Sequence, residues 1–300
     1  RRAGLGLAEA AIPHARSAVS KIAVYEAAFE LYRDNDPNLI EELRAALDDG
    51  DDLTCHYQPK INLDGSVHSV EALLRWHHPD RGLLLPAEFV PAAERAGLMR
   101  KIADRTLNLV LEQMRSWRGQ GLTLTVAVNM STINLLDLDL VGTIERLLNT
   151  YDVPAGALII EITESTLIDS VRSRHNVASL QRLGIHISLD DYGTGWSSLA
   201  RLQDVSVDEL KLDRVFVARL AHDPRSVAIV RSTVALAENL GADLVAEGVE
   251  DEVTLDALRR YGCTITQGFV HSPPLPGDEL PQWIADHAPA GRAARQPAES

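Results

Sequence analysis

The chain has 300 residues, 45% of them hydrophobic and 24% charged, a composition typical of a globular protein that buries one barrel-sized core. Its 43 acidic and 29 basic residues give a formal net charge of −14, which argues against a nucleic-acid polymer as partner, because such a polymer is bound by positive charge. Every apolar run is shorter than the roughly 18 residues that a membrane-spanning helix needs, so we expect no membrane contact from this chain.

The N-terminal residues 1–48 combine a helical pattern, LAEAAIPHARSAV, with a short β-rich run, KIAVY, and most of a linking helix predicted over residues 37–49. Arg1 and Arg2 are not followed by the apolar core of a signal peptide, so we expect a cytoplasmic location. A longer parent protein with a membrane anchor of its own stays open as an alternative.

From Leu53 onward, β-rich runs alternate with amphipathic helical segments, the pattern of repeated βα units. The eight runs are LTCHYQPK, VHSVEALLRW, LTLTVAVNM, ALIIEIT, IHISLDD, VDELKLD, ADLVAEG and CTITQGF. Eight strands within residues 49–287 favour a closed α/β barrel. The alternative is an open doubly wound sheet, which the absence of a glycine-rich dinucleotide fingerprint argues against.

The first two runs are separated only by the turn NLDGS, which leaves no room for a helix. They should therefore pair as an antiparallel hairpin. The predicted fold is a modified TIM-type (β/α)8 barrel with an antiparallel first strand. Residues 288–300 are small and polar and include proline, which predicts a disordered tail.

Polar residues stand in or directly after nearly every predicted strand. Strands that are buried on both faces should be almost entirely apolar, so these residues are informative. In a parallel barrel the carboxyl ends of the strands converge on the catalytic face. The residues concerned are Gln58, Glu71, Asn129, Glu161, Asp190, Asp191, Lys211, Glu247 and Gln267.

Oxygen-bearing side chains from five of these strands predict a metal site. They are Glu71, Asn129, Glu161, Asp190, Asp191 and Glu247. A single strand carboxylate is about as often an ion-pair partner, but a cluster of carboxylates repels itself unless cations lie within it. Ligation by oxygen alone favours Mg²⁺ or Mn²⁺. Two such ions could activate a shared water for displacement at phosphorus, with Lys211 adding positive charge nearby.

A family resemblance extends from Leu53 to Trp283. The segments that carry it are HYQPKINL, VEALLRWHHPDRG, VAVNMS, IIEITES, LDDYGTGWSSLARL, VDELKLD, LVAEGVE, TQGF and PPLP. In this order they resemble the motifs of EAL domains, phosphodiesterases that hydrolyse the second messenger cyclic di-GMP to linear 5′-pGpG. Tyr192 and Trp196 replace the commoner Phe and Tyr. Residues 1–48 resemble the degenerate end of a GGDEF domain followed by a linker helix.

The resemblance implies a ligand set for two metal ions, either Mg²⁺ or Mn²⁺. The first ion would be held by Glu71, Asn129, Glu161 and Asp190. The second would be held by Asp190, Asp191 and Glu247. Lys211 would orient the hydrolytic water, and Glu247 is also the family's usual candidate for the general base.

The resemblance also implies residues that bind the substrate and stabilise the site. The positions matching those that hold phosphate or guanine groups are Gln58, Leu74, Arg75, Asp213, Glu250 and Gln267. Glu164 matches a residue that stabilises the loop LDDYGTGWSS, and because this loop is linked to dimerisation in the family, a homodimer is implied. The predicted function is metal-dependent hydrolysis of cyclic di-GMP. The alternative is a catalytically weak or inactive cyclic di-GMP receptor.

Overall fold

The computed structural model of the chain describes residues 37–163, 166, 170–193, 206–220 and 222–287. The predictions for residues 1–36, for the tail 288–300 and for Glu164 lie outside these residues. The chain divides into two compact units. Among the described residues, the larger unit contains residues 55–73 and those from Ala103 to His287, and the smaller contains residues 37–54 together with Leu74–Ile102. None of the helices in the described residues combines the length and apolar character needed to span a membrane.

Strands and helices alternate along most of the chain. The strands are β1 (Leu53–Asn62), β2 (Val67–His78), β3 (Gly82–Leu84), β4 (Val126–Asn129), β5 (Leu158–Thr163), β6 (His186–Tyr192), β7 (Glu209–Leu212), β8 (Asp243–Ala246), β9 (Ile265–Thr266) and β10 (Leu275–Pro276). The helices are α3 (Pro37–Asp49), α4 (Pro86–Arg95), α5 (Met99–Gly119), α6 (Thr132–Leu135), α7 (Leu140–Tyr151), the 3₁₀ turn η1 (Ala155–Ala157), α9 (Val171–Arg182), α11 (Arg214–Val217), α12 (Pro224–Leu240), α13 (Glu252–Arg260) and α14 (Leu280–His287).

Eight of these strands form the predicted closed barrel. Parallel pairing joins β2 to β4 and continues in order through β9, and pairing of β1 with both β9 and β2 closes the ring. β1 runs antiparallel to β9, with Ile61 opposite Thr266. The prediction of an antiparallel first strand is therefore confirmed.

The turn between β1 and β2 shows why no helix separates these two strands. Asn62 N donates to Ser66 O at 2.9 Å, and Gly65 has a φ of 82°, which an L-residue with a side chain rarely adopts. The chain therefore reverses within a few residues. Two short strands were not predicted: β10 pairs antiparallel with β1, and β3 pairs antiparallel with the end of β2. Both are too short for an alternating pattern to be detected.

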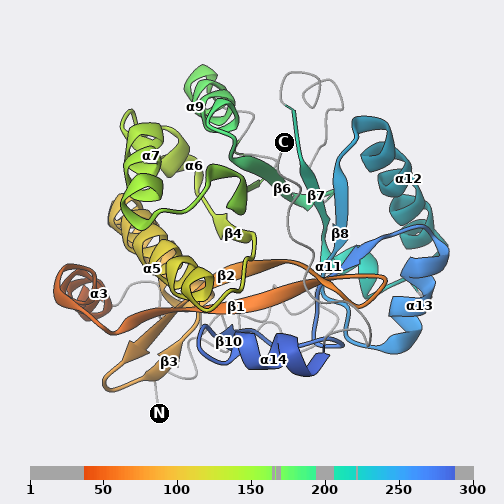
Figure 1. Cartoon of the computed structure of the whole chain (residues 1–300), viewed down its shortest axis with the longest axis horizontal. Coiled ribbons are helices and arrows are strands. Elements are labelled where there is room, and N and C mark those ends of the chain that lie inside the picture. Colours follow the sequence, from red (N-terminus) through yellow and green to blue (C-terminus); the bar gives the residue numbers. More distant parts are fainter. Residues whose placement is uncertain (1–36, 164–165, 167–169, 194–205, 221, 288–300) are drawn as a thin grey trace, which may run out of the picture. The chain divides into compact units, whose positions relative to one another are not determined.

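The surrounding helices follow the predicted amphipathic segments. α12 illustrates the local causes: Asp223 accepts a hydrogen bond from Arg225 N at 2.9 Å, Pro224 occupies the first turn, and Gly241 ends the helix at a φ of 68°. The helix packs against β7 and β8 (Figure 1).

Charged side chains point into the barrel, and the alternation of side chains along the strands explains why. β7 has the sequence ELKL, and all four residues are buried. Successive side chains in a strand point to opposite faces. Leu210 and Leu212 therefore lie on one face of β7, and Glu209 and Lys211 lie on the other, inside the barrel. The same alternation directs Glu161 of β5 inward.

In the smaller unit, Trp76 packs edge-on against Phe89 with ring centroids 5.6 Å apart. His77 Nε2 lies 3.1 Å from Thr54 Oγ1, and His78 Nε2 lies 2.9 Å from Glu42 Oε2. These two adjacent histidines thus have local polar partners within their own unit.

Candidate active site

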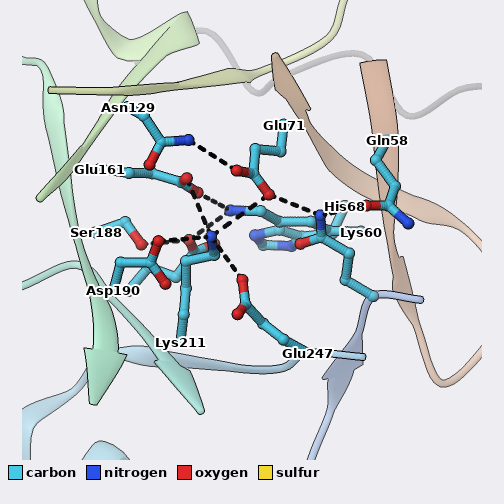
Figure 2. Close-up of polar contacts among 12 residues, drawn as sticks. Gln58, Lys60, His68, Glu71, Asn129, Glu161, Ser188, Asp190, Lys211 and Glu247 are labelled. Atoms are coloured by element: carbon cyan, nitrogen blue, oxygen red, sulfur yellow. Dashed lines mark hydrogen bonds and ion pairs between the residues drawn. The ribbon is translucent and has the colours of Figure 1, made fainter. Parts of the chain in front are cut away.

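Lys211 of β7 lies among four carboxylates, three from other strands of the barrel and one, Glu247, directly after β8 (Figure 2). Its Nζ atom is 2.6 Å from Glu247 Oε1, 3.1 Å from Glu161 Oε2, 3.3 Å from Asp190 Oδ2 and 3.4 Å from Glu71 Oε2. The structure therefore brings together the carboxylates that were predicted from strand ends. We call these four residues the acidic cluster.

Two amide side chains hold Glu71 in place. Asn129 Nδ2 donates to Glu71 Oε1 at 2.8 Å, and Gln267 Nε2 donates to Glu71 Oε2 at 2.8 Å. Gln267 Nε2 also lies 3.2 Å from Gln58 Oε1, and Gln58 Nε2 donates to Ser272 O at 3.1 Å. Four predicted site residues therefore form one hydrogen-bonded group.

Asp190 and Asp191 are consecutive, and strict strand alternation would separate them. β6 has a register shift between Leu189 and Tyr192, and Asp191 adopts a left-handed φ of 57°. Asp191 N donates to Asp190 Oδ1 at 2.8 Å. Burial raises the pKa of Asp191, and the neighbouring carboxylates of Asp190 and Asp213 raise it further. The irregular strand end thus allows both aspartates to contribute to the same charged region.

The acidic cluster carries more negative charge than the nearby lysines neutralise. Burial lowers the pKa of Lys211, but the surrounding carboxylates reverse this and raise it well above its usual value, so the side chain stays charged. Burial and the Glu71 carboxylate raise the pKa of Glu161 to about 8. For Glu71, burial is outweighed by the two lysines and by amide hydrogen bonds, and the pKa is lowered to about 2. Burial raises the pKa of Glu247 to about 7 despite Lys211.

A second polar layer lies in the barrel interior beside the acidic cluster, and it was not predicted. Lys60 Nζ lies 2.8 Å from Glu161 Oε1 and 2.6 Å from Glu209 Oε1. Ser188 Oγ donates to the same Glu209 oxygen at 2.6 Å. A sequence signal existed: Lys60 is two residues from Gln58, and Glu209 is two residues from Lys211, so each shares an inward face with a predicted site residue.

A cavity of about 220 Å³ opens beside the cluster. Its lining contains Gln58, Glu71, Leu73, Arg214, Glu247, Gly248, Glu250, Gln267, Gly268 and Phe269. Gln267 Oε1 is buried and has no hydrogen-bond partner among the described residues, so its capacity to accept a hydrogen bond is unused.

The remaining predicted substrate-binding residues are placed differently. Asp213 caps α11, where its Oδ1 accepts from Val215 N at 2.7 Å, and it interacts with Asp191. Leu74 and Arg75 belong to the smaller unit, in which Arg75 Nη1 donates to Leu74 O at 2.9 Å.

The chemistry of the acidic cluster fits a hard divalent cation, because carboxylate and amide oxygens are the donors that Mg²⁺ and Mn²⁺ prefer. In the described part of the chain, no three Asp, Glu, His or Cys side chains are already arranged around one metal position. The carboxylates are instead spread around the Lys211 ammonium. Metal binding would therefore require these side chains to rearrange locally.

A closed α/β barrel with charged residues converging at its strand ends is the architecture of a barrel enzyme. A family model for the EAL domain matches residues 40–274. The chain belongs to the EAL domain family.

Two relatives illustrate the similarity. The bifunctional diguanylate cyclase/cyclic di-GMP phosphodiesterase MucR of Pseudomonas aeruginosa is 38% identical over 282 residues, which are 93% of this chain and 41% of MucR. The cyclic di-GMP phosphodiesterase PdeR of Escherichia coli is 38% identical over 242 residues, which are 80% of this chain and 36% of PdeR. The chain thus spans about two fifths of the length of these curated relatives.

Solved structures show the same fold. The PaMucR phosphodiesterase in complex with c-di-GMP matches with a TM-score of 0.77 and 40% identity, covering 81% of this chain and 99% of that one. The EAL domain of Mycobacterium smegmatis DcpA matches with a TM-score of 0.65 and 31% identity, covering 80% of this chain and 98% of that one.

Proposed function

We propose that this chain hydrolyses one phosphodiester bond of cyclic di-GMP in a metal-dependent reaction that yields linear 5′-pGpG. The observation that carries the proposal is the convergence of four carboxylates on Lys211 beside a cavity. The substrate is inferred from relatives named as cyclic di-GMP phosphodiesterases and from the c-di-GMP complex of PaMucR.

The proposed ligands are those of the sequence prediction. Glu71, Asn129, Glu161 and Asp190 would hold one Mg²⁺ or Mn²⁺ ion. Asp190, Asp191 and Glu247 would hold a second. When bound, such a pair supplies a water of lowered pKa and positive charge at the phosphate.

Glu247 is the proposed general base. Its side chain is 20% exposed and lines the cavity, so its carboxylate is accessible to a water molecule beside a bound substrate. Lys211, whose Nζ atom lies 2.6 Å from Glu247 Oε1, is the residue proposed to orient the hydrolytic water. Its ammonium group also stabilises the negative charge that develops on the phosphate oxygens.

The proposed substrate contacts are with the phosphate or guanine groups. Gln58, Glu250 and Gln267 line the cavity, which supports this role for them. The same role for Leu74, Arg75 and Asp213 depends on the family motifs alone. A homodimer, with Glu164 stabilising the loop after β6, is likewise proposed from those motifs.

The direct test is to incubate a dimeric sample of the purified chain with cyclic di-GMP and either Mg²⁺ or Mn²⁺, and to separate the nucleotides chromatographically. We expect 5′-pGpG to accumulate and EDTA to stop the reaction. Glu71→Gln should abolish turnover, whereas Glu238→Gln, at an exposed position on α12, should not. If neither ion supported turnover, the proposal would be wrong. Tight nucleotide binding without turnover would instead indicate a receptor.

A further inference from the structure

We propose that Lys60 is a positioning residue that fixes one oxygen of Glu161 so that the other faces the metal cluster. This inference rests on the metal-dependent function proposed above. It concerns the interior layer formed by Lys60, Glu209 and Ser188, to which the family motifs assigned no role.

The two oxygens of Glu161 contact different lysines. Lys60 Nζ lies 2.8 Å from Oε1, and Lys211 Nζ lies 3.1 Å from Oε2 (Figure 2). Both Lys60 and Glu161 have no exposed side-chain surface. Both oxygens contact a buried cation, but Lys211 is shared among all four carboxylates of the acidic cluster, whereas Lys60 contacts Glu161 and Glu209. Oε2 is therefore the oxygen that faces an ion at the acidic cluster.

Lys60 is itself fixed. Glu209 Oε1 lies 2.6 Å from its Nζ atom, and Ser188 Oγ donates to that same Glu209 oxygen at 2.6 Å. The antiparallel direction of β1 brings Lys60 into this layer from the strand that also carries Gln58. The ammonium group therefore has a defined position next to Glu161.

A purely structural role is a weaker explanation of this layer. Burying a lysine and a glutamate requires both to lose their hydration, and apolar side chains of similar volume commonly fill such a space with equal or greater stability. Glu161 also lies beside the negative charges of Glu71 and Asp190. A neighbouring cation that Glu161 shares with Glu209 offsets this repulsion and holds Glu161 in one orientation.

The test removes the charged pair while keeping the barrel filled. The double variant Lys60→Met/Glu209→Gln carries no charge at these two positions. The glutamine side chain introduced at position 209 can still accept the hydrogen bond from Ser188, so the double variant should fold. The matched control is Glu209→Gln alone, in which Lys60 remains beside Glu161. Mn²⁺ affinity is measured without substrate, by calorimetry or by the electron paramagnetic resonance signal of free Mn²⁺. Thermal unfolding in EDTA checks the fold of each variant.

We expect the double variant to bind Mn²⁺ about 10- to 100-fold more weakly than the wild type, the range found when groups that orient metal ligands are removed. The control should bind within about threefold of the wild type. Turnover by the double variant should recover as Mn²⁺ is raised, because the defect lies in ligand positioning.

A folded double variant with wild-type Mn²⁺ affinity would overturn the inference, and so would a control weakened as much as the double variant. A wild-type chain that binds Mn²⁺ without hydrolysing cyclic di-GMP would contradict the proposed function. The Mn²⁺ affinities of the double variant and the control would still decide the role of Lys60. A wild-type chain that binds no Mn²⁺ would contradict both.

Discussion

At the scale of single residues, the barrel places one ammonium group among four carboxylates. Such an arrangement is stable only if positive charge or protons offset the repulsion between the acids. Lys211 supplies one charge, and the raised pKa values of Glu161 and Glu247 show that protons supply more in the metal-free protein. Divalent ions would take over from those protons.

Replacing Lys211 by Met tests this balance. We expect the metal-free variant to lose about 3 kcal/mol of its free energy of unfolding near pH 8, because the carboxylates then lack a partner. Mn²⁺ should restore more stability to this variant than it adds to the wild type. Hydrolysis should fall at least about 100-fold. Thermal unfolding with and without Mn²⁺, together with turnover, provides the measurements.

The matched control is Lys101→Met, since the exposed Lys101 pairs with Asp48. An exposed ion pair contributes little to stability, so this variant should behave like the wild type. A Lys211→Met protein with unchanged stability and rate would contradict the role assigned to the ammonium group.

The pKa values also predict how metal affinity depends on pH. Glu161 and Glu247 have pKa values of about 8 and about 7, above the usual value of 4.5, so the folded metal-free protein holds these protons more tightly than the unfolded chain. Their contribution to stability is full below the usual value and declines as the pH rises toward 8. A metal ion must displace the protons, so Mn²⁺ affinity should increase between pH 6 and pH 8.

Calorimetric titration with Mn²⁺ in two buffers of different ionisation enthalpy measures this displacement. We expect about one or more protons to be released per chain at pH 7, and fewer from Glu161→Gln. Binding without any proton release would show that the cluster is already fully ionised.

At the scale of elements, the loop after β8 has a geometry that only glycine fits. Gly248 follows Glu247 directly, and its φ is 65°. A Cβ atom added there would lie 2.5 Å from Arg214 Cβ at the start of α11. Any larger residue would therefore displace α11 or the segment that carries Glu247.

Gly248→Ala should reduce turnover and stability, because it combines a left-handed backbone with this steric clash. Gly241→Ala is the matched control: its φ is 68°, but an added Cβ would meet no atom within 4 Å. The control should lose only about 1 kcal/mol of stability and keep its activity. Urea unfolding and turnover of both variants make the comparison. Equal losses of activity would contradict the proposed importance of the loop geometry.

Much of the element order could be predicted from sequence, since β-rich runs between amphipathic helical segments marked the eight barrel strands and the short NLDGS turn required an antiparallel β1. The exceptions have physical causes. β3 and β10 extend over only three and two residues, and α6 and α11 over only four, too few to show a period. The polar residues at strand ends identified the acidic cluster.

The interior layer of Lys60 and Glu209 was not predicted, although strand alternation places each of them on the same face as a predicted site residue. From the sequence alone, a charged residue in a strand is as easily an outward-facing one. Only the closed barrel shows that Lys60 and Glu209 meet across its interior. The register shift in β6 and the left-handed backbone of Asp191 are further features that regular alternation does not reveal.

At the scale of the whole molecule, the chain is an EAL domain barrel that spans about two fifths of its curated relatives. The central claim is that the acidic cluster at the strand ends holds the metal ions that hydrolysis requires. The family assignment supports this claim. The carboxylate oxygens that surround Lys211 Nζ are the candidate metal donors.

The most direct measurement is X-ray diffraction from crystals of the chain soaked in Mn²⁺, with data collected at the manganese absorption edge. The account predicts an anomalous peak, or a pair of peaks, bonded to oxygens of Glu71, Glu161 and Asp190 at about 2.2 Å, with the Lys211 ammonium moved aside. An acidic cluster without an anomalous peak, at an Mn²⁺ concentration that supports turnover in solution, would contradict it.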